Sequence, residues 1–423
     1  MIPSQEKLPA DYMLVPATEI SARITTFQQR LSKADLDGAV VLDGVNLFYF
    51  AGTRQQGLLF IPQRGRPVFF VRRSLERARQ ESPLESLMPV ARFEEIPPWI
   101  AGAGYGTSKL GLSYTAVPLS IYRKLQSIFP HTEFQDIGPT LAMVRAVKSA
   151  YEVALMREAG TRHGQIFAEI PGLVSPGMTE WQLGSAIHGE MLKRGFTGLT
   201  RLAAFNSELF AGVVSFGDSG NHPTASVGPD GLLGLGAAFP LLGGSRSLRH
   251  GEIIFVDSGF SYGGYYTDMT RIFCLGRPPE VALDAHGICL EVQEAVRKRL
   301  KPGAVPGEIY EEVYETLLRG QIRGQIRGQN QGQFQGRGAE ENFMGYGSNQ
   351  VPFLGHGIGL EVDEFPAIAK KIRVPLEKNM VVAVEPKKGL AGVGLVGIEN
   401  TFLVTEQGGE KLTIGKDDII ALS

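Results

Sequence analysis

The chain has 423 residues, of which 43% are hydrophobic and 20% are charged, so it is long enough to form two domains with sizeable cores. Its formal net charge of −2 gives no overall reason to expect binding to nucleic acid. Two cysteines exclude a disulfide framework and favour a reducing compartment. Because the sequence shows no signal peptide and no run of roughly 18 apolar residues, we expect a cytoplasmic protein that does not enter a membrane.

Residues 1–144 are predicted to form an α/β domain. Strands and helices alternate in this part, which is typical of a layered α/β architecture. The predicted elements are, in chain order, a helix at 20–34, strands at 39–42, 58–61, 67–71 and 109–112, and a helix at 120–127.

Residues 145–423 are predicted to form a second domain of the α+β class with an antiparallel sheet. Residues 141–152 suggest a long linking helix, and Ser149 is a candidate cap for its continuation. Short strands punctuated by glycine are expected between the later helices. Those helices are predicted at 179–194, 279–300 and 307–318.

Residues 319–338, RGQIRGQIRGQNQGQFQGRG, differ in composition from the rest of the chain. Arg-Gly-Gln units repeat and few residues are apolar, so the segment cannot bury enough surface to fold alone. Its basic, glycine-rich character is similar to that of sequence-tolerant RNA-binding tails. We favour a solvated, low-complexity insert, because the run is short and lies inside a domain, and we expect no nucleic acid partner.

Two carboxylates occur in the segment VDSGFSYGGYYTDMTR, which is predicted to form a hairpin of two apolar strands. With Tyr262 and Gly263 at the turn, Asp257 and Asp268 would lie directly opposite each other, with Cβ atoms roughly 5 Å apart. Two like charges that close in a half-dry site favour either a shared proton or a cation between them. The alternative is that Asp257 begins the turn and Asp268 is a solvated strand residue.

Three further residues bear polar groups in apolar or glycine-rich surroundings. His356 lies among glycines in LGHGIGLEVDEFP, Glu385 ends the apolar strand of MVVAVEPKKG, and Glu399 interrupts that of LVGIENTFLVT. Each has a structural explanation when taken alone, as a core histidine or a salt-bridged glutamate. Four acids and one histidine in such places are harder to explain singly, because an unpaired buried charge is costly.

Charge counting favours a pair of divalent metal ions among these side chains. The four carboxylates bring four negative charges, two divalent ions bring four positive charges, and a neutral histidine adds a nitrogen ligand. Oxygen-rich ligation with one imidazole suits Mn²⁺, our first expectation, or Co²⁺, Zn²⁺ or Fe²⁺. Two metals about 3.5–4 Å apart can share a bridging water and lower its pKa, so the sequence predicts a hydrolytic centre.

The ordered set VDSG…TDMTR…GHGIGLEVDE…VEP…GIENT resembles the pita-bread metallopeptidases, which include Xaa-Pro aminopeptidases, prolidases, methionine aminopeptidases and the related creatinases. Upstream, 46-NLFYFAG-52 is similar to the creatinase-like N-terminal domain, and 145-RAVKSAYEVALMREA-159 to the entry into the catalytic half. The resemblance covers the whole chain. It implies a creatinase-like α/β domain at 1–144 and a pita-bread catalytic domain at 145–423, with a curved antiparallel sheet flanked by helices.

The resemblance also implies a role for each predicted ligand. Asp257 would bind one metal ion with both oxygens, and Asp268 and Glu399 would bridge the two ions. His356 and Glu385 would complete the coordination of the second ion, and Glu385 would orient or deprotonate the bridging water. Creatinase itself works without metal and lacks these ligands, so their presence favours the metal-dependent branch.

Two positions depart from the family pattern. The family usually has a histidine in V-H-E-x-P, where this chain has Asp363, and another before the first aspartate, where 238-AFPLLGG-244 has none. The resemblance gives these imidazoles a role in stabilising the tetrahedral intermediate, and losing such a donor costs about 10²–10³ in rate. We predict that His222 is the substitute, the alternative being a surface loop histidine. We also predict that Asp363 accepts a hydrogen bond from a substrate amine.

These observations predict a metal-dependent peptidase that hydrolyses the peptide bond before proline in a short peptide or dipeptide. Its catalytic residues would be Glu385, His222 and Asp363. The absent histidines leave open a non-peptidase metallohydrolase or lyase of the same fold that acts on a small metabolite. A catalytically weak binding protein is a third hypothesis, which the intact ligand set disfavours. The resemblance further implies a homodimer.

Overall fold

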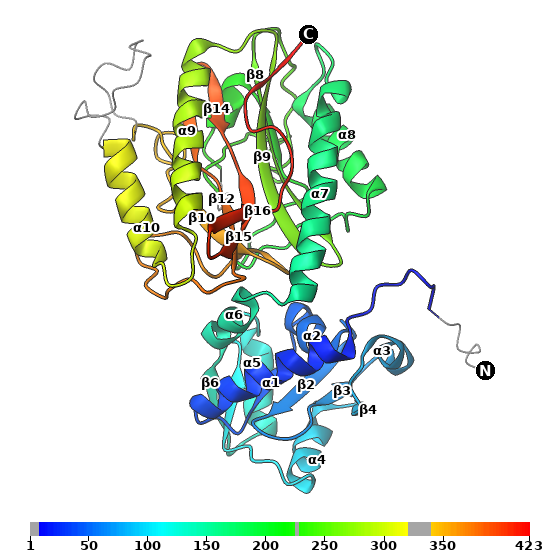
Figure 1. The fold of residues 1–423 in the computed structure, drawn as a ribbon. Helices are drawn as coiled ribbons and strands as arrows, with labels where there is room; N and C mark the ends of the chain where they lie inside the picture. The colour runs from blue at the N-terminus through cyan, green and yellow to red at the C-terminus, as the bar shows by residue number, and fades with distance from the viewer. Residues whose placement is uncertain (1–7, 225–227, 320–339) are drawn as a thin grey trace. The chain divides into compact units, whose positions relative to one another are not determined.

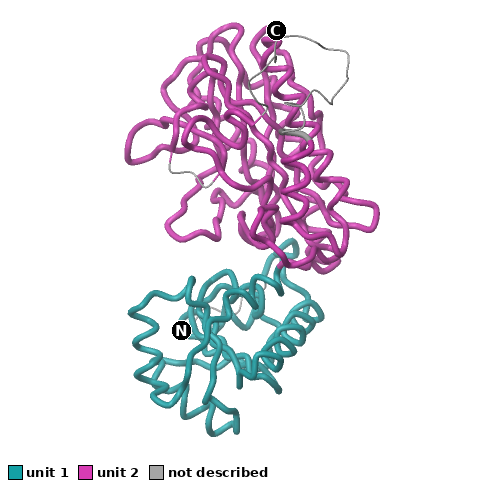
Figure 2. The backbone as a smooth tube through the Cα atoms, turned by 90° about the vertical axis from the view of Figure 1, so that its left-hand side faces the viewer, with its two compact units in different colours: residues 1–145 teal, residues 146–423 magenta. Residues whose placement is uncertain are grey.

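The computed structural model describes residues 8–224, 228–319 and 340–423. The chain divides into two compact units, residues 1–145 and 146–423 (Figure 2). The insert predicted at 319–338 lies outside the described residues, apart from its first residue. Among the residues described, no helix combines the length and the apolar character that a membrane span requires.

The first unit is built on one six-stranded mixed sheet in the order β4-β3-β2-β1-β5-β6 (Figure 1). Strand β2 pairs antiparallel with β1 and β3, whereas the remaining neighbours are parallel. The central strands are buried along their whole length, which explains their unbroken apolar runs. The strands are β1 (Gly38–Val41), β2 (Gly57–Pro62), β3 (Val68–Val71), β4 (Leu87–Pro89), β5 (Lys109–Leu112) and β6 (Glu133–Asp136).

Helices join these strands and confirm the predicted α/β class. A core of aromatic and aliphatic side chains, including Phe60, Phe70, Leu110 and Leu125, is buried in this unit. The helices are α1 (Ala17–Lys33), α2 (Gly44–Ala51), α3 (Leu75–Glu81), α4 (Ile96–Gly102), α5 (Leu119–Ile128) and α6 (Gly138–Ala146), with a 3₁₀ turn η1 (Phe93–Glu95).

The second unit contains two larger, mostly antiparallel sheets and one separate strand pair. One sheet has the order β17-β9-β8-β7, the other β11-β10-β12-β15-β16, and β13 pairs with β14. The first sheet comprises β7 (Val213–Phe216), β8 (Ile253–Tyr262), β9 (Tyr265–Leu275) and β17 (Ile420–Leu422). The others are β10 (Gly355–Ile358), β11 (Val362–Glu364), β12 (Val381–Val384), β13 (Lys387–Leu390), β14 (Gly394–Gly397), β15 (Asn400–Thr405) and β16 (Gly408–Lys411).

Helices cover these sheets from both sides, as the predicted pita-bread arrangement requires (Figure 1). Helix α7 (Ala150–Leu173) packs on β8 and β9 and on α8 (Glu180–Lys193). Helix α9 (Glu280–Arg299) packs on β12, β13, β14 and β16, and on α10 (Pro306–Val313), which continues into a π-helical turn. The site described below therefore lies on strands that are held between two helical layers.

The helix predicted across residues 141–152 is wrong, because the structure has two helices there, α6 and α7. Ser149 has an extended backbone and caps α7 as predicted. Its hydroxyl accepts from the amide of Glu152, and the Glu152 carboxylate accepts from the amide of Ser149, which is a capping box. The amide of the buried Lys148 donates to the carbonyl of Asn379 at 3.0 Å, so the break is tied to the strands.

The hairpin of β8 and β9 forms as predicted, but in a different register. Its turn lies at Gly263 and Gly264, which have φ angles of 58° and 89° and suit a tight two-residue turn. Asp257 therefore pairs with Thr270 rather than with Asp268, and the prediction that the two aspartates oppose each other is wrong. The shift of two residues leaves both on the same face of the sheet, because side chains alternate with a period of two.

A buried histidine ties α7 to this hairpin. The Nδ1 atom of His163 is 3.2 Å from Thr267 Oγ1, and its Nε2 atom is 3.1 Å from Ser258 Oγ. Burial lowers the pKa of His163 to about 3, and the positive charge of Arg271 acts in the same direction. The imidazole is therefore neutral in the folded protein at any moderately acidic pH.

The low pKa of His163 predicts a loss of stability in acid. Below pH 6.5 the histidine binds a proton in the unfolded chain but not in the folded one. Its contribution is therefore present above that pH and falls by about 1.4 kcal/mol per pH unit below it, until the folded pKa is reached. We expect the unfolding free energy of His163→Gln, measured by urea denaturation at neutral and at mildly acidic pH, to fall less than that of the original protein. Equal losses in both proteins would contradict this account.

Candidate metal centre

The five predicted ligands converge on one cavity in the second unit. Asp257 lies on β8, Asp268 on β9 and His356 on β10. Glu385 directly follows β12, and Glu399 directly precedes β15. All are buried except Asp257, which is half-buried. Residues far apart in the chain are thus brought together because each lies on, or at the end of, a strand of the two adjoining sheets.

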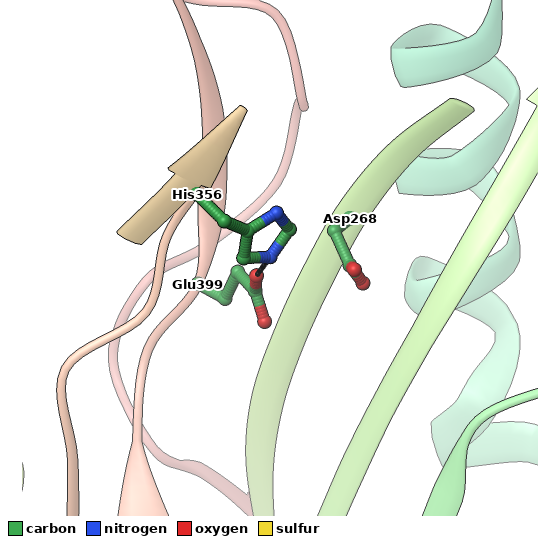
Figure 3. Close-up of side chains that lie close together, drawn as sticks. All are labelled: Asp268, His356 and Glu399. Atoms are coloured by element: carbon green, nitrogen blue, oxygen red, sulfur yellow. Dashed lines mark ion pairs between the residues drawn. The ribbon is translucent and has the colours of Figure 1, made fainter. Parts of the chain in front are cut away.

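One set of three residues fits a divalent ion. Asp268, His356 and Glu399 each offer a ligand atom, and these atoms lie within 4.8 Å of one another (Figure 3). The Nδ1 atom of His356 donates to the carbonyl oxygen of Gly357 at 3.0 Å, which leaves Nε2 as the lone-pair donor for a metal. The buried Oε1 of Glu399 has no hydrogen-bond partner among the described residues. A cation would compensate this oxygen, which is otherwise costly to bury.

A lysine that our sequence analysis did not single out lies in the other half of the centre. Lys387 Nζ is 2.6 Å from Asp257 Oδ2, 2.7 Å from Glu385 Oε2 and 3.2 Å from Glu399 Oε2. The side chain is 1% exposed. Asp257 and Glu385 therefore already contact a fixed positive charge, and their surroundings do not fit a second metal ion at the same place. The sequence did contain a signal for this lysine. Glu385 and Lys387 are two residues apart, and residues i and i+2 of an extended segment point to the same face.

Glu399 is the carboxylate that stays ionised. Burial acts to raise its pKa, but the ammonium of Lys387, the imidazole of His356 and a hydrogen bond from Thr270 outweigh burial and hold the pKa at about 2. Burial likewise acts to lower the pKa values of His356 and Lys387, but the surrounding carboxylates raise both well above their usual values.

The other carboxylates bind protons more readily. Burial raises the pKa of Asp257 to about 7 and that of Glu385 to about 8, although Lys387 acts in the opposite direction. Burial, together with the charges of Glu399 and Asp257, raises the pKa of Asp268 well above its usual 3.8. A divalent ion that binds here would therefore displace protons, which makes its affinity increase with pH.

A layer of hydrogen bonds behind the ligands fixes their orientation. Thr270 Oγ1 donates to Glu399 Oε2 at 3.0 Å, and Arg271 Nη1 donates to the backbone oxygen of Glu399 at 2.8 Å. Arg271 is itself 1% exposed and contacts Asn400 Oδ1 at 2.8 Å and Asp417 Oδ1 at 3.0 Å. Such partners hold a ligand in the geometry that a metal requires.

The two predicted substitutes for the absent histidines lie in different places. Asp363 lines the cavity, its Oδ1 is 3.6 Å from His356 Nδ1, and its buried Oδ2 has no hydrogen-bond partner among the described residues. His222 is exposed at the end of the 3₁₀ turn η2 (Gly217–Asn221), with Nδ1 3.3 Å from the Ser219 carbonyl oxygen. It is not among the described residues that line the cavity.

Part of the cavity lining is apolar. A charged group at one end and apolar side chains around it are typical of a site for a small organic ligand. The apolar lining residues are Leu202, Leu209, Val213, Leu232, Pro240, Leu241 and Val362.

Comparison with known proteins identifies the family. The model of metallopeptidase family M24 matches residues 154–406, and that of the creatinase/prolidase N-terminal domain matches residues 23–147. The chain belongs to metallopeptidase family M24. This assignment confirms the resemblance seen in the sequence, and the candidate ion site formed by Asp268, His356 and Glu399 agrees with the metal dependence of M24 peptidases.

Relatives of this M24 protein match it over nearly their whole length. An uncharacterised peptidase of Staphylococcus epidermidis is 26% identical over 396 residues, which cover 92% of this chain and 98% of that protein. The Xaa-Pro dipeptidase of Pyrococcus furiosus is 24% identical over 393 residues, which cover 92% and 97%. The structure of the Xaa-Pro dipeptidase from Bacillus anthracis has a TM-score of 0.74 at 24% identity and covers 95% of this chain and 100% of that one, which confirms the predicted fold.

The geometry of the M24 centre predicts which carboxylate is essential for binding the ion. Asp268→Asn removes a charged ligand, so we expect the affinity for Mn²⁺ to fall by more than about 100-fold, beyond the loss typical of residues behind the ligands. Isothermal titration and metal analysis after dialysis measure this change. Glu208→Gln is the matched control, because Glu208 is an exposed carboxylate on the same cavity wall. Unchanged Mn²⁺ affinity in Asp268→Asn would refute the assignment.

Proposed function

We propose that this protein is a metal-dependent peptidase that hydrolyses the peptide bond before proline in short peptides or dipeptides. The observation that carries the proposal is the buried set of Asp268, His356 and Glu399 at one end of a cavity with an apolar wall. The full-length similarity to a protein named as an Xaa-Pro dipeptidase supports the specificity. Mn²⁺ is our first expectation for the ion, because the ligands are oxygen-rich.

We assign ion binding and proton transfer to different residues of the centre. Asp268, His356 and Glu399 would hold the ion, which when bound supplies a polarised carbonyl and a water of lowered pKa. Glu385 has its Oε1 atom 3.5 Å from His356 Nε2, so it faces the ion-binding atoms. In the site without an ion, burial raises the pKa of Glu385 to about 8. Such a carboxylate can accept a proton at Oε1 from the attacking water and return it to the leaving nitrogen.

Asp363 is suited to bind the free amino group of a substrate. Its Oδ2 atom is buried and has no hydrogen-bond partner among the described residues, and the residue lines the cavity. A substrate ammonium would supply the missing donor and form a charge-assisted hydrogen bond. This contact would place the N-terminal residue beside the centre and the following proline against the apolar wall.

A second candidate is a metallohydrolase or lyase of the same fold that acts on a small metabolite. Among the described residues that line the cavity, His356 is the one histidine. Without a second imidazole at the substrate, a tetrahedral intermediate would lack the hydrogen-bond donor that the family resemblance assigns to a histidine. A lyase, whose elimination forms no such intermediate, would not need that donor, and a metallohydrolase would need a donor from the substrate or from another residue.

The proposed specificity predicts a preference between matched dipeptides. With Mn²⁺ present, we expect Ala-Pro and Gly-Pro type substrates to be hydrolysed in preference to Ala-Ala and Gly-Ala, because proline buries more apolar surface on the cavity wall. Chelation by EDTA should abolish the activity, and added Mn²⁺ should restore it. Chromatography of the products measures both effects. Turnover of small acylated amines or esters without turnover of any peptide would favour the second candidate.

The proposed role of Asp363 predicts a selective loss. Asp363→Asn removes a hydrogen bond between charged groups worth about 1.5–3 kcal/mol, so kcat/KM should fall about 10- to 100-fold for substrates with a free amino group. N-formylated forms of the same peptides, which lack the charged amine, should show little difference between the two proteins. The Mn²⁺ content should be unchanged in the variant. Equal losses on free and blocked substrates would argue against an amine contact.

A further inference from the structure

We propose that the ammonium group of Lys387 takes the place of one metal ion, so that this centre holds a single divalent ion and uses a lysine as its second cation. The inference rests on the metal centre of the proposed function, and it replaces the pair of ions predicted from the sequence. It concerns a residue that lies two positions after the predicted ligand Glu385.

The ammonium of Lys387 lies where a metal ion between Asp257 and Glu385 would lie. An ammonium has three N–H donors, and Lys387 Nζ has three carboxylate acceptors, from Asp257 at 2.6 Å, Glu385 at 2.7 Å and Glu399 at 3.2 Å. A metal ion bound by Asp257 and Glu385 would lie about 2.0–2.2 Å from the same oxygens. It would therefore overlap with Nζ. A metal ion and the Lys387 ammonium therefore cannot both occupy the position between Asp257 and Glu385.

Both the backbone and the side chain of Lys387 are held in place. Its backbone is part of β13 and pairs with Gly397 of β14, and its carbonyl oxygen accepts from the amide of Met344 at 2.8 Å. Its side chain is 1% exposed, and Nζ lies 5.8 Å from the ring centroid of Phe255. The ammonium cannot move into solvent without losing all three carboxylate partners and unpacking its buried stem. Lys387 is thus a built-in part of the centre.

Space, rather than charge, decides how many ions fit. Asp230 and Asp363 line the cavity together with the four predicted carboxylate ligands, so counting charges does not fix the number of ions. The remaining ligand atoms of Asp268, His356 and Glu399 form one compact set. That set accommodates one ion, and Glu399 joins the two halves because its Oε2 contacts Lys387 while its Oε1 faces His356.

Lys387 then acts as a positioning residue. It holds the carboxylates of Asp257 and Glu385 at fixed places through charge-assisted hydrogen bonds. The other carboxylate oxygen of Glu385 stays directed at His356 Nε2, at 3.5 Å. In this arrangement a single ion binds on the His356 side, and the lysine neutralises the Asp257 side without exchanging with solvent.

Metal stoichiometry tests the proposal without relying on activity. The purified protein is stripped of metal, saturated with Mn²⁺ and analysed by equilibrium dialysis with elemental mass spectrometry, and by EPR. We expect one Mn²⁺ per chain and the spectrum of an isolated ion. Lys387→Ala opens the second place, so this variant should bind two ions and show an exchange-coupled pair. Lys388→Ala is the matched control, because the neighbouring Lys388 is also buried but bonds to the Glu341 carbonyl oxygen; it should bind one.

Several results would overturn the inference. They are two ions or none in the original protein, a coupled EPR spectrum in that protein, or a single ion in folded Lys387→Ala. If Lys387→Ala does not fold, the stoichiometry and the EPR spectrum of the original protein decide alone. The proposed function fails separately: one bound ion without turnover of proline peptides would contradict the function and leave the lysine assignment intact.

Discussion

The second unit depends on keeping positive charge among the largely buried carboxylates that line one cavity. Asp257, Asp268, Glu385 and Glu399 come from separate strands, and their mutual repulsion would push those strands apart or force the acids to bind protons. Lys387, with its three carboxylate contacts, meets part of this demand from within the chain. We assign the rest to His356 and to the proposed divalent ion, which agrees with the metal dependence of M24 peptidases.

The architecture of the unit serves this constraint. The hairpin of β8 and β9 supplies the aspartates, and the strands of the adjoining sheet supply the histidine and the glutamates. The bridge between Thr270 and Glu399 and the buried guanidinium of Arg271 connect the two sheets at the site. Helices on either side exclude water from the strands, which strengthens every charge interaction between them. Thr270 and Arg271 therefore both join the two sheets and orient Glu399.

Much of this could be predicted from the sequence, because the signals are local. Apolar strands, helix periodicity and the capping box at Ser149 and Glu152 depend on neighbouring residues, and the family pattern of five ligands is carried by short motifs. The hairpin register was wrong by two residues because the predicted turn was Tyr262-Gly263, whereas Gly263-Gly264 places glycine at both positions of positive φ. Lys387 was missed because charge counting considered acids and metals, whereas its burial depends on strands far away in the chain. The placement of His222 likewise depends on loop geometry that no local pattern encodes.

A positive charge that is attached to the backbone has a consequence that a dissolved ion does not share. The three carboxylate contacts of Lys387 form within the chain, so they do not require a bound metal ion. Newly made chains can then close the strands around the pocket first and acquire the ion afterwards. Scarcity of that element would leave a pool of complete but idle molecules, ready for use when the supply returns.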